Sequence, residues 1–373
     1  MTVGTWPWRE QGISRGIYWG WELIRELPRG PFGAYLRAHH LGVPGVISRF
    51  AMGYGAIFMV QRVRSLAESL LDTGAIAETD PLLLHEMISL VLQQGLDVAP
   101  LSEVRTRLSS RTNTQRFVCF TFDGAYRSTL ANVVPLFRER ALPYTLFVSS
   151  DFLDTGRAPW WMALEALVVH SASIRLYRAN KVMDFACGND AEKRDCFARL
   201  FLSVAGMSSS ARAEHVALLC AQHGINIGAV AAREMLTGQE LRALADDPLA
   251  TIGSQGGGAS PLSAMSYDEA RDDLVGGLDK LEAVLGARPS YIAFPGTEPG
   301  SAGQREFTLA AGLGIDMALT TVEGALWPEH AFEPFAQPRI ALDNDPATLV
   351  RALMLSAGSD YSGRTAAQRK AIA

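Results

Sequence analysis

The segment from Arg116 to Phe122 is a run of β-forming, mostly apolar residues that ends at a single carboxylate, Asp123. Aromatic and β-branched residues at this density favour a buried strand. Gly124 comes next and indicates a turn, so Asp123 is expected at the carboxyl end of the strand. In α/β barrels catalytic groups gather at this end, because the βα loops form one mouth. Asp123 is therefore the first candidate for a functional side chain.

Short apolar runs and amphipathic segments alternate along most of the chain. Strands are expected at residues 56–60, 116–122, 144–148, 249–253, 291–294 and 317–321, and helices at 80–94, 129–142, 304–312 and 346–356. A further helix is expected after Ser266, which forms a capping box with Glu269, and it should stop at Gly286. This alternation is typical of parallel βα units.

The rhythm changes between about residues 159 and 236. Helical character dominates there, at 160–170, 191–204 and 210–223, with one strand pair expected within 173–185. We interpret this stretch as a helical insertion in a barrel of residues 55–357. Residues 1–54 then form an N-terminal extension, and the small polar residues of 358–373 favour a flexible tail.

Composition limits the class of partner. The chain has 373 residues, 48% hydrophobic, with a formal net charge of −5, so nothing favours a nucleic-acid partner. Its four cysteines are scattered without CxxC spacing, which favours buried or incidental thiols over a disulfide framework.

The N-terminal residues lack the basic start and apolar core of a secretory signal, so the sequence predicts a cytoplasmic protein. The tryptophan- and arginine-bearing stretch 16–37 leaves one alternative open, association with a membrane surface. A helix packed on the barrel is the preferred interpretation of that stretch.

The motif Thr121-Phe122-Asp123-Gly124-Ala125-Tyr126 resembles the Thr-Phe-Asp-Asp-Gly-Tyr signature of polysaccharide deacetylases, the NodB-homology or carbohydrate esterase 4 family. The resemblance implies an α/β fold, a distorted (β/α)7 TIM-like barrel of the NodB-homology type with an inserted helical lobe. It also implies a site that normally binds zinc or another divalent metal.

Three metal-site positions of that family are changed. Gly124 stands at the second aspartate of the signature. In the segment Ile252 to Ser263, which resembles Ile-Gly-Ser-His-x-x-x-His-x-x-Leu-Ser, Gln255 and Ala259 stand at the two histidines. Alanine has no ligand atom, and glutamine has only a neutral oxygen. We therefore predict no metal cofactor.

Other motifs match the family with further changes. Gln61 stands at the histidine of an apolar-x-His-Arg-Val motif. The resemblance implies that substrate is contacted by residues at the open end of the barrel and at the start of the inserted lobe. These residues are Tyr126, Trp160, Trp161, Gly296 and Glu298.

Several of these residues allow two interpretations. Asp123 is either a working base or a carboxylate that holds its loop by hydrogen bonds. Trp160 and Trp161 either provide aromatic faces on which a sugar stacks or pack in the protein core, and core packing is the preferred interpretation. Gly256-Gly257-Gly258 lacks the Lys-Ser or Lys-Thr of a phosphate loop and favours tight backbone packing, and Asp246-Asp247-Pro248 is typical of a turn.

The preferred hypothesis is a polysaccharide deacetylase-like protein of carbohydrate metabolism, metal-free and impaired or inactive as an N-deacetylase, with a carbohydrate-binding or scaffold role. Its partner would be an N-acetylated oligo- or polysaccharide or the machinery that makes it. One alternative is a metal-independent hydrolase of non-peptide C–N bonds that uses Asp123. The second is an active carbohydrate deacetylase with unrecognised metal ligands.

Overall fold

The structure is a computed structural model that describes residues 54–344, apart from 66–70, 72–76, 111–114, 154, 179–180, 259 and 297–299. The stretch 16–37 and the helix expected at 346–356 lie outside the described residues. So do Ala259 and Glu298.

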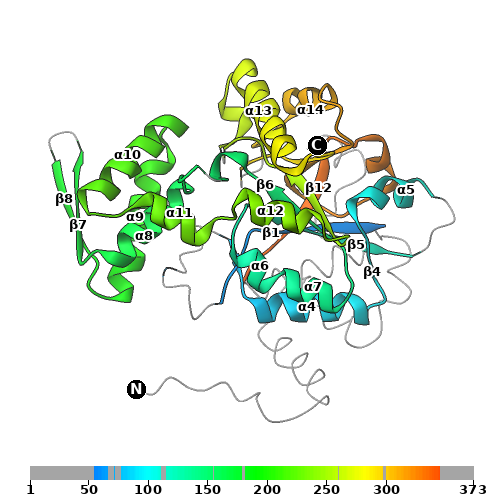
Figure 1. Ribbon diagram of the computed structural model, residues 1–373, viewed down its shortest axis with the longest axis horizontal. Helices are drawn as coiled ribbons and strands as arrows, with labels where there is room; N and C mark the ends of the chain where they lie inside the picture. The colour runs from blue at the N-terminus through cyan, green and yellow to red at the C-terminus, as the bar shows by residue number, and fades with distance from the viewer. Residues whose placement is uncertain are drawn as a thin grey trace, which may run out of the picture.

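Within the described residues, seven parallel strands close into a barrel (Figure 1). Their spatial order is β1 (Gly55–Val60), β12 (Gln337–Leu342), β11 (Met317–Glu323), β10 (Tyr291–Ala293), β9 (Ala250–Ser254), β6 (Tyr144–Val148) and β5 (Phe117–Asp123). β1 pairs with β12 on one edge and with β5 on the other, which closes the ring. The predicted (β/α)7 barrel is confirmed.

Short strands and helices surround the barrel. They are β2 (Arg62–Val63), β3 (Glu78–Thr79), α4 (Pro81–Gln93), β4 (Asp97–Val98), α5 (Val104–Ser109), α6 (Ser128–Asn132), α7 (Val134–Glu139), α12 (Gly238–Ala245), α13 (Tyr267–Leu285) and α14 (Gln304–Ala311). Single 3-10 turns lie at Leu101–Glu103, Ser150–Phe152, Leu262–Ala264 and Pro328–Phe332. The capping box of Ser266 and Glu269 and the stop at Gly286 are present on α13, as predicted.

The single helix expected at 129–142 is wrong. The chain forms α6 and α7 with a break at Val133, and Pro135 lies in the first turn of α7. Proline has no N–H to donate to the preceding turn, so it is tolerated at a helix start and interrupts a helix interior. The strand β12 was also missed, although it closes the barrel.

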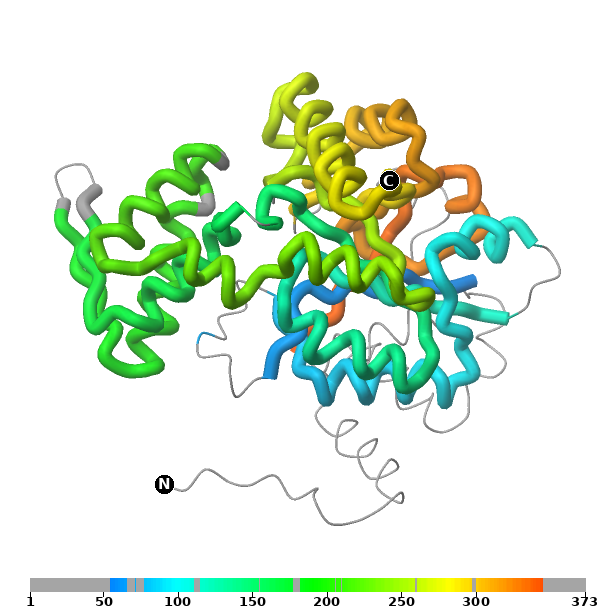
Figure 2. Tube along the Cα trace, in the orientation of Figure 1, coloured from blue at the N-terminus to red at the C-terminus, as the bar shows by residue number. Residues whose placement is uncertain are grey.

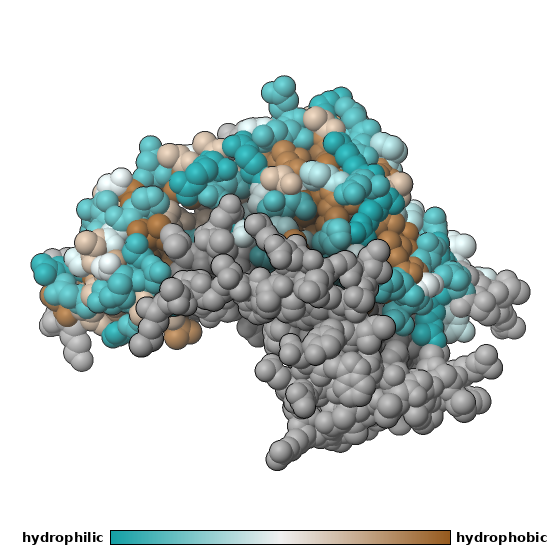
Figure 3. Space-filling model, turned by 90° about the horizontal axis from the view of Figure 1, so that it is seen from below, coloured by the Kyte–Doolittle hydropathy of each residue, from teal (hydrophilic) through white to brown (hydrophobic). Residues whose placement is uncertain are grey.

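Between β6 and α12 the chain forms a lobe, which we define as α8 (Trp160–His170), β7 (Ser173–Arg178), β8 (Lys181–Ala186), α9 (Asp190–Ala205), α10 (Ser209–Gln222) and α11 (Ile227–Glu234). β7 and β8 pair as an antiparallel hairpin. Figure 2 shows the lobe to one side of the barrel, joined to it through α8 and α11. On the face shown in Figure 3, apolar surface is more extensive over the barrel than over the lobe. The lobe has its own apolar core, which includes Leu164, Phe197 and Leu200.

All four cysteines are buried free thiols, as predicted. Among the described residues, no single helix has the length and hydropathy of a membrane span; Ser210–Gln222 and Ile227–Glu234 reach that hydropathy only as a pair bent by 107°.

Candidate functional site at the barrel mouth

The alternation of side chains along β5 directs Asp123 into the barrel. Successive residues of a strand point to opposite faces. Phe120 and Phe122 pack outward against the helices, whereas Phe117 and Cys119 lie in the inner core of the barrel. Asp123 shares the parity of the inner residues and is the last residue of the strand. Its carboxylate is therefore buried, with 5% of the residue exposed.

Arg339 of β12 binds this carboxylate with both ends of its guanidinium group. Nη1 donates to Oδ1 at 2.7 Å and Nη2 donates to Oδ2 at 2.9 Å. The Arg339 side chain has no exposed surface, and its Nε donates to the Thr320 carbonyl at 2.9 Å. A bidentate pair of this kind is strong and fixed in direction, because both hydrogen bonds are charge-assisted. The charge of the Asp123 carboxylate is thus compensated inside the protein by the guanidinium of Arg339.

Gln255 supplies a third hydrogen bond to Asp123. It follows β9, and its backbone N–H donates to the Val148 carbonyl at 2.8 Å, which fixes the loop against β6. Its side-chain Nε2 donates to Asp123 Oδ2 at 3.2 Å, while its Oε1 accepts from the Ser149 hydroxyl at 3.2 Å. Asp123 and Gln255 thus meet at the mouth, and the amide uses both of its ends within the protein.

These residues do not fit a divalent metal. Both oxygens of Asp123 accept charge-assisted hydrogen bonds from Arg339, so a metal ion bound there would lie beside a guanidinium cation that repels it. Gln255 turns its N–H toward the carboxylate and its oxygen toward a hydroxyl. In the part of the chain that the structure describes, no group of three or more His, Cys, Asp or Glu residues is placed to hold a metal ion.

Gly124 adds a backbone reason. Its φ is +98°, a conformation that L side chains rarely adopt. A Cβ atom there would lie 2.5 Å from Cε2 of Tyr126. An aspartate at this position would require both a strained backbone and a shift of the tyrosine ring. The change at this position therefore involves the local backbone as well as the side chain.

Tyr126 lies between the barrel mouth and the lobe. It is buried, and the guanidinium of Arg62 stands over its ring at 5.8 Å. Burial raises the pKa of Tyr126 to about 12, against the lowering effects of Arg62 and the Trp161 indole. The hydroxyl stays protonated at neutral pH, so it can donate a hydrogen bond but does not act as a base.

The other predicted site residues are dispersed. Trp160 packs inside the lobe, with ring centroids 4.8 Å from Phe201, which supports the core-packing interpretation of this residue. Trp161 is half-buried beside the barrel core. Gly296 and Gln61 are half-buried, after β10 and β1 respectively.

The triglycine segment is tightly packed backbone, as interpreted. Asp273 of α13 accepts hydrogen bonds from the N–H groups of Gly257 and Gly258 at 3.1 and 3.2 Å. A Cβ atom on Gly277 of the same helix would lie 2.4 Å from the Gly256 carbonyl carbon. The helix therefore approaches the loop as closely as two backbones allow.

Asp247 holds a turn, as predicted. Its carboxylate accepts from the Leu249 N–H at 3.0 Å and from Arg138 at 2.6 Å. Burial alone would raise the pKa of Asp247, but these two donors bring it below its ordinary value.

The pairing of Arg339 with Asp123 and the ion pairs around Arg62 were not predicted from sequence, although Arg339 lies in a segment, Pro338 to Ile340, that resembles the family. Arg62 binds Glu165 at 2.9 Å and Glu234 at 2.8 Å. The available signal for Arg339 was the spacing of two between Gln337 and Arg339 in a strand-like run, which places both on one face.

No family model matches the chain, and no curated protein matches it. Several solved structures do. The deacetylase PplD of Streptococcus pyogenes is 14% identical, with 82% of this chain and 98% of PplD covered at a TM-score of 0.51. IcaB from Ammonifex degensii is 12% identical, with 83% and 99% covered at 0.51. A polysaccharide deacetylase from Bacillus cereus is 11% identical, with 81% and 68% covered at 0.50.

Identities this low establish the fold and not the activity. The barrel, its strand order and these structural relatives agree with the resemblance seen in the sequence motifs. The chain therefore has the NodB-type (β/α)7 fold of polysaccharide deacetylases.

Proposed function

We propose that this chain is a cytoplasmic, polysaccharide deacetylase-like protein of carbohydrate metabolism that does not carry out metal-dependent N-deacetylation. It binds an N-acetylated oligo- or polysaccharide, or serves as a scaffold for the machinery that makes one. The observation that carries this proposal is the engagement of both Asp123 oxygens by Arg339 and Gln255.

Metal-dependent amide hydrolysis needs an ion that lowers the pKa of water from about 15.7 toward about 7. At about 1.36 kcal/mol per pKa unit, that is on the order of 10 kcal/mol of help in forming hydroxide. The reaction also needs a carboxylate that is free to take the proton of the water. Both oxygens of Asp123 are held by the Arg339 guanidinium, and the neighbouring Gln255 is a poor metal ligand.

The metal-independent hydrolase receives less support from the same contacts. As a base, Asp123 would have to accept a proton on an oxygen that already binds the Arg339 guanidinium. A substrate would therefore have to reach a carboxylate whose two oxygens are both held by Arg339. The contacts instead favour the second interpretation of Asp123, a group that holds the mouth in shape.

Purified protein incubated with chito-oligosaccharides, with and without added zinc, tests the proposal. We expect calorimetry to show saturable binding of chitotetraose, the four-sugar chito-oligosaccharide. We expect no release of acetate that is stimulated by metal. Release of acetate that requires zinc, with one metal per chain by elemental analysis, would restore the active deacetylase with unrecognised ligands.

Turnover without metal that is abolished in Asp123→Asn would instead favour the C–N hydrolase. The matched control is Asp195→Asn, because Asp195 is an exposed carboxylate of the lobe helix α9. This control should behave as the unmodified protein in every assay.

A further inference from the structure

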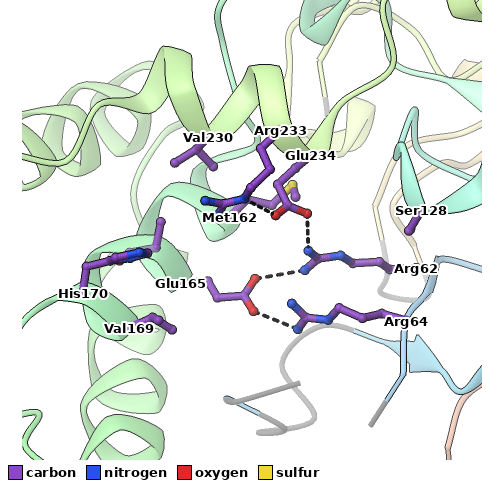
Figure 4. Close-up of a pocket in the computed structure, with 11 residues that line it drawn as sticks. Arg62, Arg64, Ser128, Met162, Glu165, Val169, His170, Val230, Arg233 and Glu234 are labelled. Atoms are coloured by element: carbon purple, nitrogen blue, oxygen red, sulfur yellow. Dashed lines mark hydrogen bonds and ion pairs between the residues drawn. The ribbon is translucent and has the colours of Figure 1, made fainter. Parts of the chain in front are cut away.

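A cavity of about 300 Å³ lies between the barrel and the lobe, beside the mouth rather than inside it. The barrel contributes Arg62, Arg64 and Ser128, and the lobe contributes side chains of α8 and α11 (Figure 4). Small-molecule pockets in proteins begin at about this volume, roughly 300 Å³. The cavity is therefore large enough for a single small ring and too small for a long segment of polymer.

Four apolar side chains form one part of the lining, Met162, Ala166, Val169 and Val230. The rest is charged or polar. This combination of an apolar surface and a few fixed polar groups is typical of sites that bind and orient a small ligand.

The charged groups are already paired with one another. Glu165 accepts from Arg62 at 2.9 Å and from Arg64 at 2.8 Å, and it lies between the two guanidinium groups in Figure 4. Glu234 accepts from Arg62 at 2.8 Å and from Arg233 at 2.8 Å. Burial acts to lower the pKa of Arg62, but Glu165, Glu234 and Glu78 raise it overall, so Arg62 keeps its charge.

This pairing selects against charged ligands. With Glu78, the network has three arginines and three glutamates, so its charges balance. An anion or a cation would gain little electrostatic attraction in the cavity, because each charge of the network already has an opposite partner. Neutral hydroxyl groups do not depend on a net charge, and a carboxylate, which has about four acceptor sites, can bind a hydroxyl beside an arginine.

Ser128 supplies an independent observation. Its Oγ is buried and has no hydrogen-bond partner among the described residues, and the residue lines the cavity. Buried hydroxyl groups in folded proteins nearly always have a partner. A ligand hydroxyl in the cavity would provide one.

We propose that this cavity is a binding site for one neutral pyranose unit, with its apolar face on the side chains of α8 and its hydroxyls on Glu165, Glu234 and Ser128. The proposal concerns a pocket separate from the Asp123 site and does not rest on the function proposed for the mouth. The sugar is either a free monosaccharide or one unit of a chain that continues outside the cavity.

Ligand-observed NMR titrations with glucose, N-acetylglucosamine, glucuronate and inorganic phosphate test the proposal. We expect saturable binding of the neutral sugars and none of the two anions. Ser128→Ala should weaken sugar binding by about three- to tenfold, the effect of one neutral hydrogen bond. Val169→Trp, which fills the cavity from α8, should abolish it. The control Ser290→Ala changes an exposed serine just before β10, at the opposite end of the barrel, and should leave binding unchanged.

Three results would overturn the inference. They are tighter binding of glucuronate or phosphate than of the neutral sugars, no binding of the neutral sugars, and sugar binding by Ser128→Ala and Val169→Trp that equals that of the unmodified protein. Folding of each variant is checked by circular dichroism. Chitotetraose distinguishes a free monosaccharide from one unit of a longer chain. If the cavity binds one unit of a chain, chitotetraose should bind more tightly than N-acetylglucosamine, and Val169→Trp should abolish the binding of both. Tetramer binding that is unaffected by both pocket variants would leave the function proposed for the mouth in place and exclude the pocket.

Discussion

Replacement of Arg339 by methionine should destabilise the fold strongly, because it leaves the Asp123 carboxylate buried and without its cation. Arg339 has no exposed surface in its side chain and Asp123 has 6%. Removal of one partner of a buried ion pair costs about 3–5 kcal/mol. Folded domains are stable by only about 5–15 kcal/mol, so the loss should be a large fraction of the free energy of unfolding.

Urea denaturation followed by circular dichroism measures this loss. The double variant Asp123→Leu with Arg339→Met removes both charges and should recover most of the stability, because well-packed apolar groups replace a buried pair at little cost. As a surface control, Arg175→Met breaks an ion pair whose two side chains are 58% and 61% exposed. Its urea midpoint should hardly change.

The size of the loss and its recovery in the double variant provide the refuting test. A loss below about 1 kcal/mol, or a double variant no more stable than the single one, would contradict the claim that this pair neutralises the mouth.

Further tests concern a turn, a backbone contact and the changed metal positions. Asp247→Asn should lower the free energy of unfolding at neutral pH, because the pKa of Asp247 is depressed in the folded protein. The stability difference between the variant and the unmodified protein should be present above about pH 3.9, the ordinary pKa of aspartate, and should disappear as the pH falls through the depressed pKa. Gly277→Val should cost about 1–3 kcal/mol by urea denaturation, because any Cβ there meets backbone. Gly124→Asp, Gln255→His and Ala259→His combined should still bind less than one zinc per chain by elemental analysis, and full occupancy in a folded protein would show that the mouth can readily form a metal site again.

Most strands of the barrel could be predicted because their signals are local, whereas the closed (β/α)7 barrel was expected from the resemblance of the sequence motifs. Buried parallel strands are continuous apolar runs, and β1 and β5 are both fully buried along their length. Strand β12 escaped prediction because Gln337, Pro338 and Arg339 interrupt its apolar pattern. A buried arginine in a strand is expected only when its partner is known, and Asp123 lies 216 positions away in the sequence.

The functional residues likewise include some that the sequence motifs could locate and some that they could not. The convergence of Asp123 and Gln255 could be expected from motif positions, because the carboxyl ends of parallel strands meet at one mouth. The lobe cavity could not be expected, since Arg62, Glu165 and Glu234 come from three distant segments. Ion-pair networks of this kind depend on how the lobe sits against the barrel, and spacing along the chain carries no such information.

The described mouth is consistent with a pocket that satisfies itself without an ion. A carboxylate buried at the end of β5 needs compensating donors, and Arg339 and Gln255 supply three hydrogen bonds to it. A metal entering here would first have to displace a guanidinium that is also anchored to the Thr320 carbonyl. We therefore expect that substitution of ligand residues alone will not recreate a metal site. The competing cation and the left-handed backbone at Gly124 would have to change with them.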